Sequence, residues 1–272
     1  MAIITISRQT ASLGDDLAQE LAADLSYRYL DKKIVEESLK SFGFPEERIE
    51  RYDEKKPGFW DIFSSEKDRY FQLLKHAMYD FASKDNCVLL GRGGQGLFKN
   101  IPGVIKIKFM APFQIRVERF KKYYNCSTRQ AEQMLKLKDN ERDGFHKNFF
   151  GIDWESDDLY DIVINTGTVL KKTALDLIKH FVSIFPPKEL HDAALRRIRD
   201  LALAQSVLIE IIYKEHIPIQ FIDVRAEDGT VYLLGSVNTP ERIDECVRAA
   251  KGVPGVTKVV PEINVVLEYL GM

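Results

Sequence analysis

The chain has 272 residues, a formal net charge of −2 and a hydrophobic fraction of 45%, which is the composition of an ordinary water-soluble globular protein. Its length is enough for one large domain or two modest ones. A charge so close to zero gives no reason to expect a nucleic-acid partner.

The cysteines and the apolar runs indicate where the protein works. Cys87, Cys126 and Cys246 are odd in number and far apart, so they form neither a disulfide framework nor a metal-binding spacing. No apolar run reaches the roughly 18–20 residues needed to span a bilayer. The N-terminus leads directly into a strand-like run, without the basic and apolar regions of a secretory signal. We therefore expect a cytoplasmic protein that is not transmembrane.

Residues 3–23 contain the feature around which we expect the rest of the chain to be organised. Isoleucines form a short strand pattern, a turn of small residues follows, and apolar residues then recur at helical spacing from Leu17 to Leu25. A strand that passes through a tight turn into a helix is the layout of a phosphate-binding loop. In such a loop the free N–H groups of the turn and of the helix N-terminus point at the anion.

This turn lacks the usual signature of a phosphate-binding loop, G-x-x-x-x-G-K-[ST]. Two glycines, the lysine and the Ser/Thr are replaced, by Ala11, Leu13, Gly14 and Asp15. The carboxylates of Asp15 and Asp16 repel a phosphate, while Arg8 is the nearest cation and can take part of the lysine's role. Two interpretations stay open, a nucleotide phosphate cradle and an ordinary strand-to-helix turn. The cradle interpretation makes the cofactor-binding residues Ser7, Ser12, Gly14, Asp15 and Asp16.

Strand and helix patterns alternate up to residue 185. Strand patterns lie at 27–31, 87–91, 104–110 and 160–165, and helical patterns at 32–42, 66–84, 112–124, 127–142 and 169–185. Most of the strands are apolar on both faces, which predicts a parallel sheet covered by helices on both sides. The stretch 46–65 is dense in charge and predicts an exposed, mobile connection.

Two later segments carry candidate chemistry. The strand at 87–91 ends in the turn GRGGQG, where glycines such as Gly93 let the backbone approach a ligand and Arg92 can clamp a phosphate; the alternative is a plain turn with a surface arginine. The helix at 127–142 begins at Ser127, a plausible N-cap. Its charged end is either a lid that brings cations onto a transferring phosphoryl group or a solvated helix face.

Other residues allow fewer conclusions. The five histidines are scattered without a pair at ligand spacing, so we interpret them as structural or surface residues, and we expect no metal-binding cluster. Trp60 and Trp154 lie in loop-like stretches, where they are either packing anchors or hydrophobic residues of a lid. The sequence does not decide between these two roles.

A second, smaller domain is expected after Pro186-Pro187. An amphipathic helix at 190–213 is followed by two strand runs around an Asp-Gly turn, a helix opening at Thr239-Pro240 and a last strand at 256–266. This order predicts a compact α+β module of about eighty residues.

The pieces of the first domain, taken in order, resemble the cytidylate kinase-like branch of the P-loop nucleoside monophosphate kinases. The resemblance covers about residues 1–182. It rests on ITISRQTASLGDDLAQELA, YLD at 29–31, VLLGRGGQGL at 88–97, the arginine helix at 116–119, KDNER at 138–142 and YDIVINTG at 160–167. It implies a P-loop kinase-like α/β domain at 1–185, ATP and Mg²⁺ as cofactors, and phosphoryl transfer to CMP or a similar nucleotide.

The resemblance also implies roles for single residues. Ser12 and Gly14 would lie in the phosphate cradle, and Arg92, with Asp31 and Gly93, would bind the acceptor nucleotide. The catalytic set would be Arg142, Asp139 and Arg8, with Lys138 in support. Asp15 can itself ligate Mg²⁺ in place of the missing Ser/Thr.

The C-terminal module, from residue 224 to residue 266, resembles the BON domain through its strand, Asp-Gly turn, V-x-L-x-G-x-V run, helix and final strand. We place this BON-like domain at 188–272. The resemblance implies a module that binds phospholipid or another small ligand, or one that serves regulation or homo-oligomerisation.

Three hypotheses for the whole chain stay open. The first is an ATP-dependent nucleoside monophosphate kinase. The second is a catalytically weak or inactive pseudo-kinase that senses nucleotide and reports to the C-terminal module. The third is a scaffold in which Ala11 and Leu13 fill the cradle. The missing signature lysine leaves the choice between enzyme and non-enzyme open.

Overall fold

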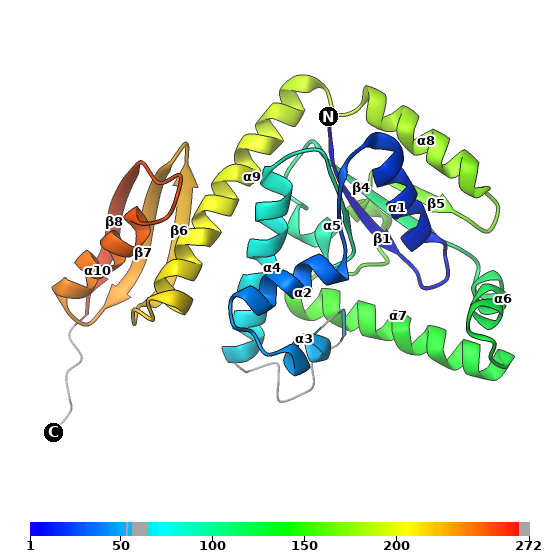
Figure 1. Cartoon of the computed structure of the whole chain (residues 1–272), viewed down its shortest axis with the longest axis horizontal. Coiled ribbons are helices and arrows are strands. Elements are labelled where there is room, and N and C mark those ends of the chain that lie inside the picture. The colour runs from blue at the N-terminus through cyan, green and yellow to red at the C-terminus, as the bar shows by residue number, and fades with distance from the viewer. Residues whose placement is uncertain (53, 56–64, 267–272) are drawn as a thin grey trace. The chain divides into compact units, whose positions relative to one another are not determined.

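The computed structural model describes residues 1–52, 54–55 and 65–266. Their elements are shown in Figure 1. The described parts of Met1–Leu74 and Lys84–Ala194 form one compact unit, and those of Lys75–Ser83 and Leu195–Met272 form a second. The domain bounds expected from the sequence, 1–185 and 188–272, stay a prediction.

The first unit is built on a five-stranded parallel sheet with the strand order β2-β3-β1-β4-β5. The strands are β1 (Ile3–Arg8), β2 (Arg28–Leu30), β3 (Cys87–Leu90), β4 (Val104–Met110) and β5 (Ile162–Asn165). Central β1 pairs with β3 on one side and β4 on the other. In open parallel sheets, ligands bind beyond the carboxyl ends of strands at such a switch in chain order. The parallel sheet expected from the sequence is confirmed, and its geometry directs attention to the loops after β1 and β3.

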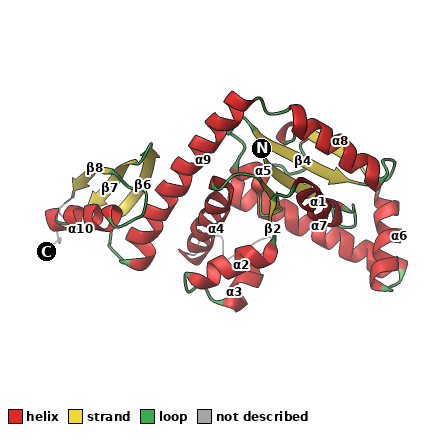
Figure 2. Cartoon of the chain, turned by 45° about the horizontal axis from the view of Figure 1, so that its top comes forward, coloured by secondary structure: helices red, strands yellow, loops and turns green. Residues whose placement is uncertain are grey.

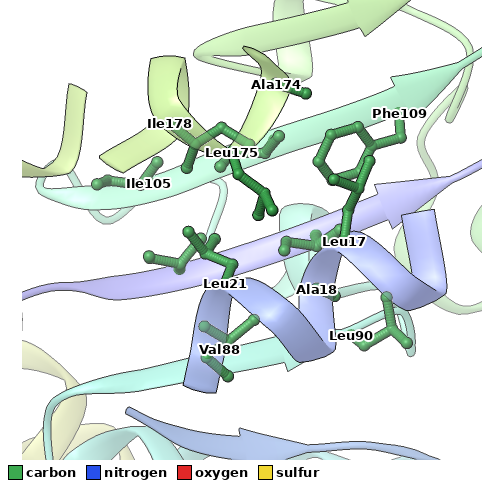
Figure 3. Packing of buried hydrophobic residues seen from close by; sticks show 14 of the residues in the cluster. Leu17, Ala18, Leu21, Val88, Leu90, Ile105, Phe109, Ala174, Leu175 and Ile178 are labelled. Atoms are coloured by element: carbon green, nitrogen blue, oxygen red, sulfur yellow. The ribbon is translucent and has the colours of Figure 1, made fainter. Parts of the chain in front are cut away.

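Helices follow the strands in the expected alternation. They are α1 (Gly14–Leu25), α2 (Lys32–Ser41), α3 (Glu46–Tyr52), α4 (Ser65–Ser83), α5 (Gly94–Leu97), α6 (Phe113–Tyr124), α7 (Thr128–Phe150) and α8 (Lys171–Ile184). On one face of the sheet, Leu17 and Leu21 of α1 and Ile178 of α8 pack against Ile105 and Phe109 of β4 (Figure 3). This apolar cluster fixes the first helix, and with it the loop that precedes the helix, against the sheet.

The structure corrects the prediction for part of residues 46–65. Glu46–Tyr52 is helix α3, and its Ile49 and Tyr52 are buried rather than exposed. The Tyr52 ring lies 5.1 Å from that of Tyr70 and 6.4 Å from that of Phe149, between ring centroids. The two apolar residues on one face of this short helix are enough to bury it, despite the surrounding charges. Trp60 lies outside the described residues.

Helix α7 is longer than the sequence pattern indicates. Ser127 forms the expected capping box with Gln130 at its start, but the helix continues past Arg142 to Phe150. Its first turns bury Ala131 and Leu135, and its last turns bury Phe145 and Phe149. The helix is therefore packed along one face, and the choice between a lid and a solvated face for its charged residues 136–142 stays open.

The second unit contains a three-stranded sheet (Figure 2). Besides Lys75–Ser83 of α4, its elements are α9 (Lys188–Ile209) from Leu195 onward, a π-helical turn at Glu210–Lys214, β6 (Gln220–Glu227), β7 (Thr230–Val237), α10 (Pro240–Lys251) and β8 (Lys258–Val265). The predicted hairpin is confirmed, because β6 and β7 are antiparallel around Asp228 and Gly229. Val231, Leu233 and Cys246 lie in its core.

Within residues 1–52, 54–55 and 65–266, no helix combines the length and the apolar character needed to cross a membrane.

Candidate active site

The loop between β1 and α1 keeps a backbone conformation suited to glycines although the glycines are absent. Ala11 and Leu13 have φ angles of 62° and 65°, in the left-handed region that few non-glycine residues adopt. Leu13 directly precedes α1, and no described residue accepts a hydrogen bond from the backbone N–H groups at 13–16. Successive free amides of this kind form a nest in which an anion can bind.

The packing around Gly14 gives a physical reason why this position holds a glycine and not the signature lysine. A Cβ atom at this position would lie 2.4 Å from Cβ of Arg8 and 2.9 Å from Cγ of Arg8. The arginine side chain therefore passes over the position from which the lysine would extend. Because the two side chains cannot share this space, Arg8 supplies a cation beside the loop where the lysine is lost.

We expect Gly14→Ala to destabilise the protein by about 1–3 kcal/mol, because the new methyl group collides with the Arg8 side chain in a packed environment. Urea unfolding followed by circular dichroism measures this. Leu170→Ala is the control in the same unit, since Leu170 is 75% exposed. Equal stability of the two variants would contradict the close packing of Arg8 over Gly14.

A single carboxylate brings three arginines together at the carboxyl ends of β1 and β3. Nη1 of Arg8 donates to both oxygens of Glu54, at 3.0 and 3.2 Å. Nε of Arg142 donates to Oε2 at 3.4 Å, and the backbone N–H of Arg92 donates to Oε1 at 2.8 Å. Nη1 of Arg92 also lies 3.4 Å from Oε1. Burial acts to raise the pKa of Glu54, but the three arginines hold that pKa well below its usual range.

Two of these arginines also contact the loop between β1 and α1. Nε of Arg8 donates to Oδ1 of Asp15 at 3.0 Å, and Nη1 of Arg142 donates to Oγ1 of Thr10 at 2.6 Å. Arg142 comes from α7, so this contact joins the helix to the loop. Arg8 and Arg142 therefore lie between the loop amides and the carboxylate of Glu54.

Two cavities meet at this cluster, and each has a volume of about 390 Å³. The one that we call the loop cavity is lined by Thr10, Ala11, Leu13, Asp15, Asp16, Arg119, Phe120, Tyr123, Tyr124, Lys138 and Arg142. The other, which we call the arginine cavity, is lined by Arg8, Lys32, Glu54, Lys55, Arg92, Lys138, Glu141 and Arg142. Lys138 and Arg142 line both cavities and thus stand at their common wall.

Helices α6 and α7 are tied to each other and to the loop by two further arginines. Nη1 of Arg116 donates to both oxygens of Asp139, at 3.1 and 2.9 Å. Arg119 donates to the carbonyl oxygen of Thr166 at 2.7 Å and to that of Ala11 at 3.3 Å. Burial raises the pKa of Asp139, and Arg116 opposes this shift. These contacts position Arg142 one turn further along α7.

The structure places most of the expected charged residues around the two cavities. The expected residues that line a cavity are Arg8, Asp15, Asp16, Arg92, Lys138 and Arg142. Asp139 is bound to Arg116, so its carboxylate holds α6 to α7.

Other expected site residues lie elsewhere. Ser7 is hydrogen-bonded to Tyr160, and the Oγ atom of Ser12 is buried without a hydrogen-bond partner among the described residues. Asp31 accepts a hydrogen bond from the N–H of Ile34 and so caps α2. Gly93 lies against the ring of Phe150, which a Cβ atom would overlap. Ser7, Asp31 and Gly93 thus make local packing or capping contacts, and none of the four lines the loop cavity or the arginine cavity.

Several residues of the site were not identified from the sequence. Glu54 lies in the stretch expected to be an exposed connection, and nothing in its charged surroundings distinguishes it. Two other residues had a sequence signal that could have identified them. Thr10 belongs to the loop after the first strand, and Arg119 belongs to the arginine helix on which the family resemblance rests. Within the described residues, no group of three or more His, Cys, Asp or Glu side chains is arranged to hold a metal ion.

A five-stranded parallel sheet covered by helices, with a tight loop between its first strand and first helix, is the P-loop kinase-like fold. Residues 3–168 match the model of the cytidylate kinase-like family, which is more than half of the chain, so the protein belongs to that family. Residues 199–266 match the model of the BON domain. Both resemblances expected from the sequence are thereby confirmed.

The cytidylate kinases among the individual relatives agree with the family assignment. A cytidylate kinase of Sulfolobus acidocaldarius is 26% identical over 195 residues, which are 70% of this chain and 97% of that protein. A cytidylate kinase of Thermococcus kodakarensis is 26% identical over 61% of this chain and 79% of that protein. A uronate isomerase of Corynebacterium glutamicum is 33% identical over 97 residues, but the chain spans only 19% of its length.

Among solved structures, an uncharacterized protein from Eubacterium ventriosum aligns with a TM-score of 0.53 and 20% identity. The alignment covers 68% of this chain and 99% of that one. At this identity the likeness shows the fold alone.

Proposed function

We propose that the first unit binds ATP with Mg²⁺ and transfers the γ-phosphoryl group to CMP or a similar nucleoside monophosphate. The observation that carries the proposal is the pair of adjoining cavities whose common wall is Lys138 and Arg142. Enzymatic phosphoryl transfer is mostly positioning and neutralisation of charge. Cations at a common wall meet this need, because donor and acceptor phosphates can approach them from opposite sides.

The loop cavity suits the donor nucleotide. The amides at 13–16 can hold phosphate oxygens, and the rings of Tyr123 and Tyr124 offer flat surfaces to a base. Asp15 and Asp16 repel a bare polyphosphate, but aspartate oxygens are Mg²⁺ ligands, so the nucleotide fits better with its cation than without it. In this proposal Mg²⁺ offsets the charge of the two aspartates.

The arginine cavity suits the phosphate of the acceptor. Arg8 and Arg92 face it from the ends of β1 and β3, and Arg142 reaches it from α7. Arginine binds phosphate oxygens bidentately and stays charged at any physiological pH. Arg8 in this proposal replaces the signature lysine, which the packing at Gly14 supports.

The test is to incubate the purified chain with ATP, Mg²⁺ and each nucleoside monophosphate, and to measure ADP and the nucleoside diphosphate by chromatography. We expect turnover with CMP or a close analogue and none without Mg²⁺. The absence of ADP with every acceptor, at milligram amounts of protein, would reject the enzymatic proposal.

A nucleotide sensor is the second candidate, and the two aspartates at the start of α1 favour it. If Asp15 and Asp16 prevent productive placement of the γ-phosphate, nucleotide binds without transfer. Calorimetry separates the candidates, because a sensor binds nucleotide tightly while turnover stays at background. The scaffold hypothesis is less well supported, because the side chain of Leu13 packs against the core cluster.

The role of the BON domain belongs to the proposal as well. We propose that it is a regulatory or ligand-binding module, with phospholipid or a small molecule as its ligand, or a surface for homo-oligomerisation. The cytoplasmic location expected from the sequence also stays a prediction.

A further inference from the structure

The carboxylate of Glu54 occupies the point in the arginine cavity on which three guanidinium groups converge. The side chains of Glu54, Arg8, Arg92 and Arg142 are only 10%, 12%, 5% and 13% exposed. A Cβ atom on Gly91 would lie 2.0 Å from Oε1 of Glu54, so the carboxylate is pressed directly against the end of β3. The carboxylate is thus part of the interior of the site rather than a charge at its rim.

The position of Glu54 is that of a counter-ion. Three buried cations close together repel each other and have lost much of their hydration, so an anion among them is strongly favoured. Glu54 provides one negative charge and two acceptor oxygens against three positive charges, and Asp15, which is paired with Arg8, provides a second negative charge. The three arginines still exceed these two carboxylates by one charge, and Lys32, Lys55 and Lys138 line the same cavity together with Glu141.

We propose that Glu54 is an internal occupant of an oxyanion site, and that a phosphoryl group of the nucleotide displaces its carboxylate when the ligand binds. The identity of that ligand as a nucleotide rests on the proposed function. The evidence for an oxyanion site is the convergence of the three arginines, and it does not depend on which molecule carries the oxyanion.

A phosphoryl group is a better partner for these arginines than a carboxylate. It carries a charge of about −1.5 to −2 and three terminal acceptor oxygens, which can each receive an N–H from a different guanidinium. Displacement also has a cost, since ligand binds only the fraction of molecules in which the site is open and its apparent affinity falls by that fraction. Glu54 therefore weakens phosphate binding in the resting protein and selects ligands with enough charge to replace it.

The test compares pyrophosphate binding by the wild-type chain, Glu54→Gln and Glu141→Gln, measured by calorimetry. Glutamine keeps the shape of Glu54 and removes its charge. Glu141 lines the same cavity, and among the described residues it has no ion pair with the three arginines, so its variant controls for the general change in charge. We expect pyrophosphate to bind Glu54→Gln at least about tenfold more tightly than wild type, and Glu141→Gln less than threefold more tightly.

Two results would overturn the proposal, and a third would support it. Unchanged or weaker pyrophosphate binding by Glu54→Gln would overturn the proposal, because Glu54 would then order the arginines for the ligand. An equal gain in both variants would also overturn it, since the effect would be one of net charge alone. If Glu54→Gln folds only when pyrophosphate is present, the proposal is supported, because the anion then replaces the missing counter-ion.

A second measurement uses the wild-type chain, in case the variant does not fold under any condition. A crystal structure with pyrophosphate is expected to show the oxyanion among Arg8, Arg92 and Arg142, with Glu54 moved away. A carboxylate still bound to the arginines beside the ligand would contradict displacement. Neither experiment depends on turnover, so a chain that makes no ADP but binds pyrophosphate as expected rejects the kinase proposal and supports this one.

Discussion

Replacing Arg142 with alanine is expected to lower the turnover number of the proposed kinase reaction by about 100- to 1,000-fold, by analogy with the removal of one well-placed donor from a transition-state site. Arg142 stands at the wall shared by the two cavities, and its Nη1 already donates to Oγ1 of Thr10, in the loop between β1 and α1, at 2.6 Å. In the proposed reaction Arg142 contacts the phosphate of the bound acceptor and also meets the charge that develops during transfer. The loss is therefore expected in kcat, and KM for the acceptor is expected to rise as well.

The measurement is a coupled ADP assay at saturating ATP and CMP, with the far-ultraviolet circular dichroism of each variant as a check on folding. Arg129→Ala is the matched control, since Arg129 is exposed in the first turn of the same helix. Its kcat should stay within about twofold of wild type. If Arg142→Ala also retained more than a tenth of the wild-type kcat, Arg142 would have no major part in the transfer.

Most of the scaffold could be predicted from the sequence because its signals are local. The strand run that begins at Ile3 and the spacing of Leu17 and Leu21 each correspond to one element, and both are found in the core cluster. The capping box at Ser127 fixes the start of α7 for the same reason. Helix α3 was missed, because its seven residues carry only two buried side chains among many charges.

The candidate site was only partly predictable because its key contacts join distant parts of the chain. Arg8 and Arg142 could be proposed from motif positions, but their common partner Glu54 lies 46 and 88 residues away from them along the chain. No spacing rule links these positions. The substitution of glycine for lysine at position 14 likewise has a physical reason only when the path of the Arg8 side chain is known.

The role of Trp154 also depends on contacts that the sequence does not show. The sequence allows it to be either a packing anchor or a hydrophobic residue of a lid. The structure buries it to 1% exposure, with its ring stacked on that of His146 at 5.8 Å between centroids and 16° between planes. Nζ of Lys108, which is 2% exposed, lies 5.9 Å from the indole centroid. Trp154 is therefore a packing anchor beneath the last turns of α7.

We expect Trp154→Ala to destabilise the first unit by about 3–5 kcal/mol, the range for removing a large aromatic side chain from a core. The loss includes the stacking contact with His146 and the apolar environment of the buried Lys108 stem. Urea unfolding followed by circular dichroism measures it, with the m-value checked because two units do not have to unfold together. Leu170→Ala is the control at a site that is 75% exposed, and it should change the free energy of unfolding by less than about 0.5 kcal/mol.

Trp154 also affects the candidate site, because its stacking partner His146 is hydrogen-bonded to the backbone of Arg142. Burial lowers the pKa of His146, so its ring is neutral near pH 7, and its Nδ1–H donates to the carbonyl oxygen of Arg142 at 2.7 Å. Trp154 holds that ring in place, so its loss should loosen the turn of α7 that carries Arg142. A Trp154→Ala chain with wild-type stability would show that α7 is held by its other contacts, such as the pair of Arg116 and Asp139, and that Arg142 does not depend on Trp154 for its position.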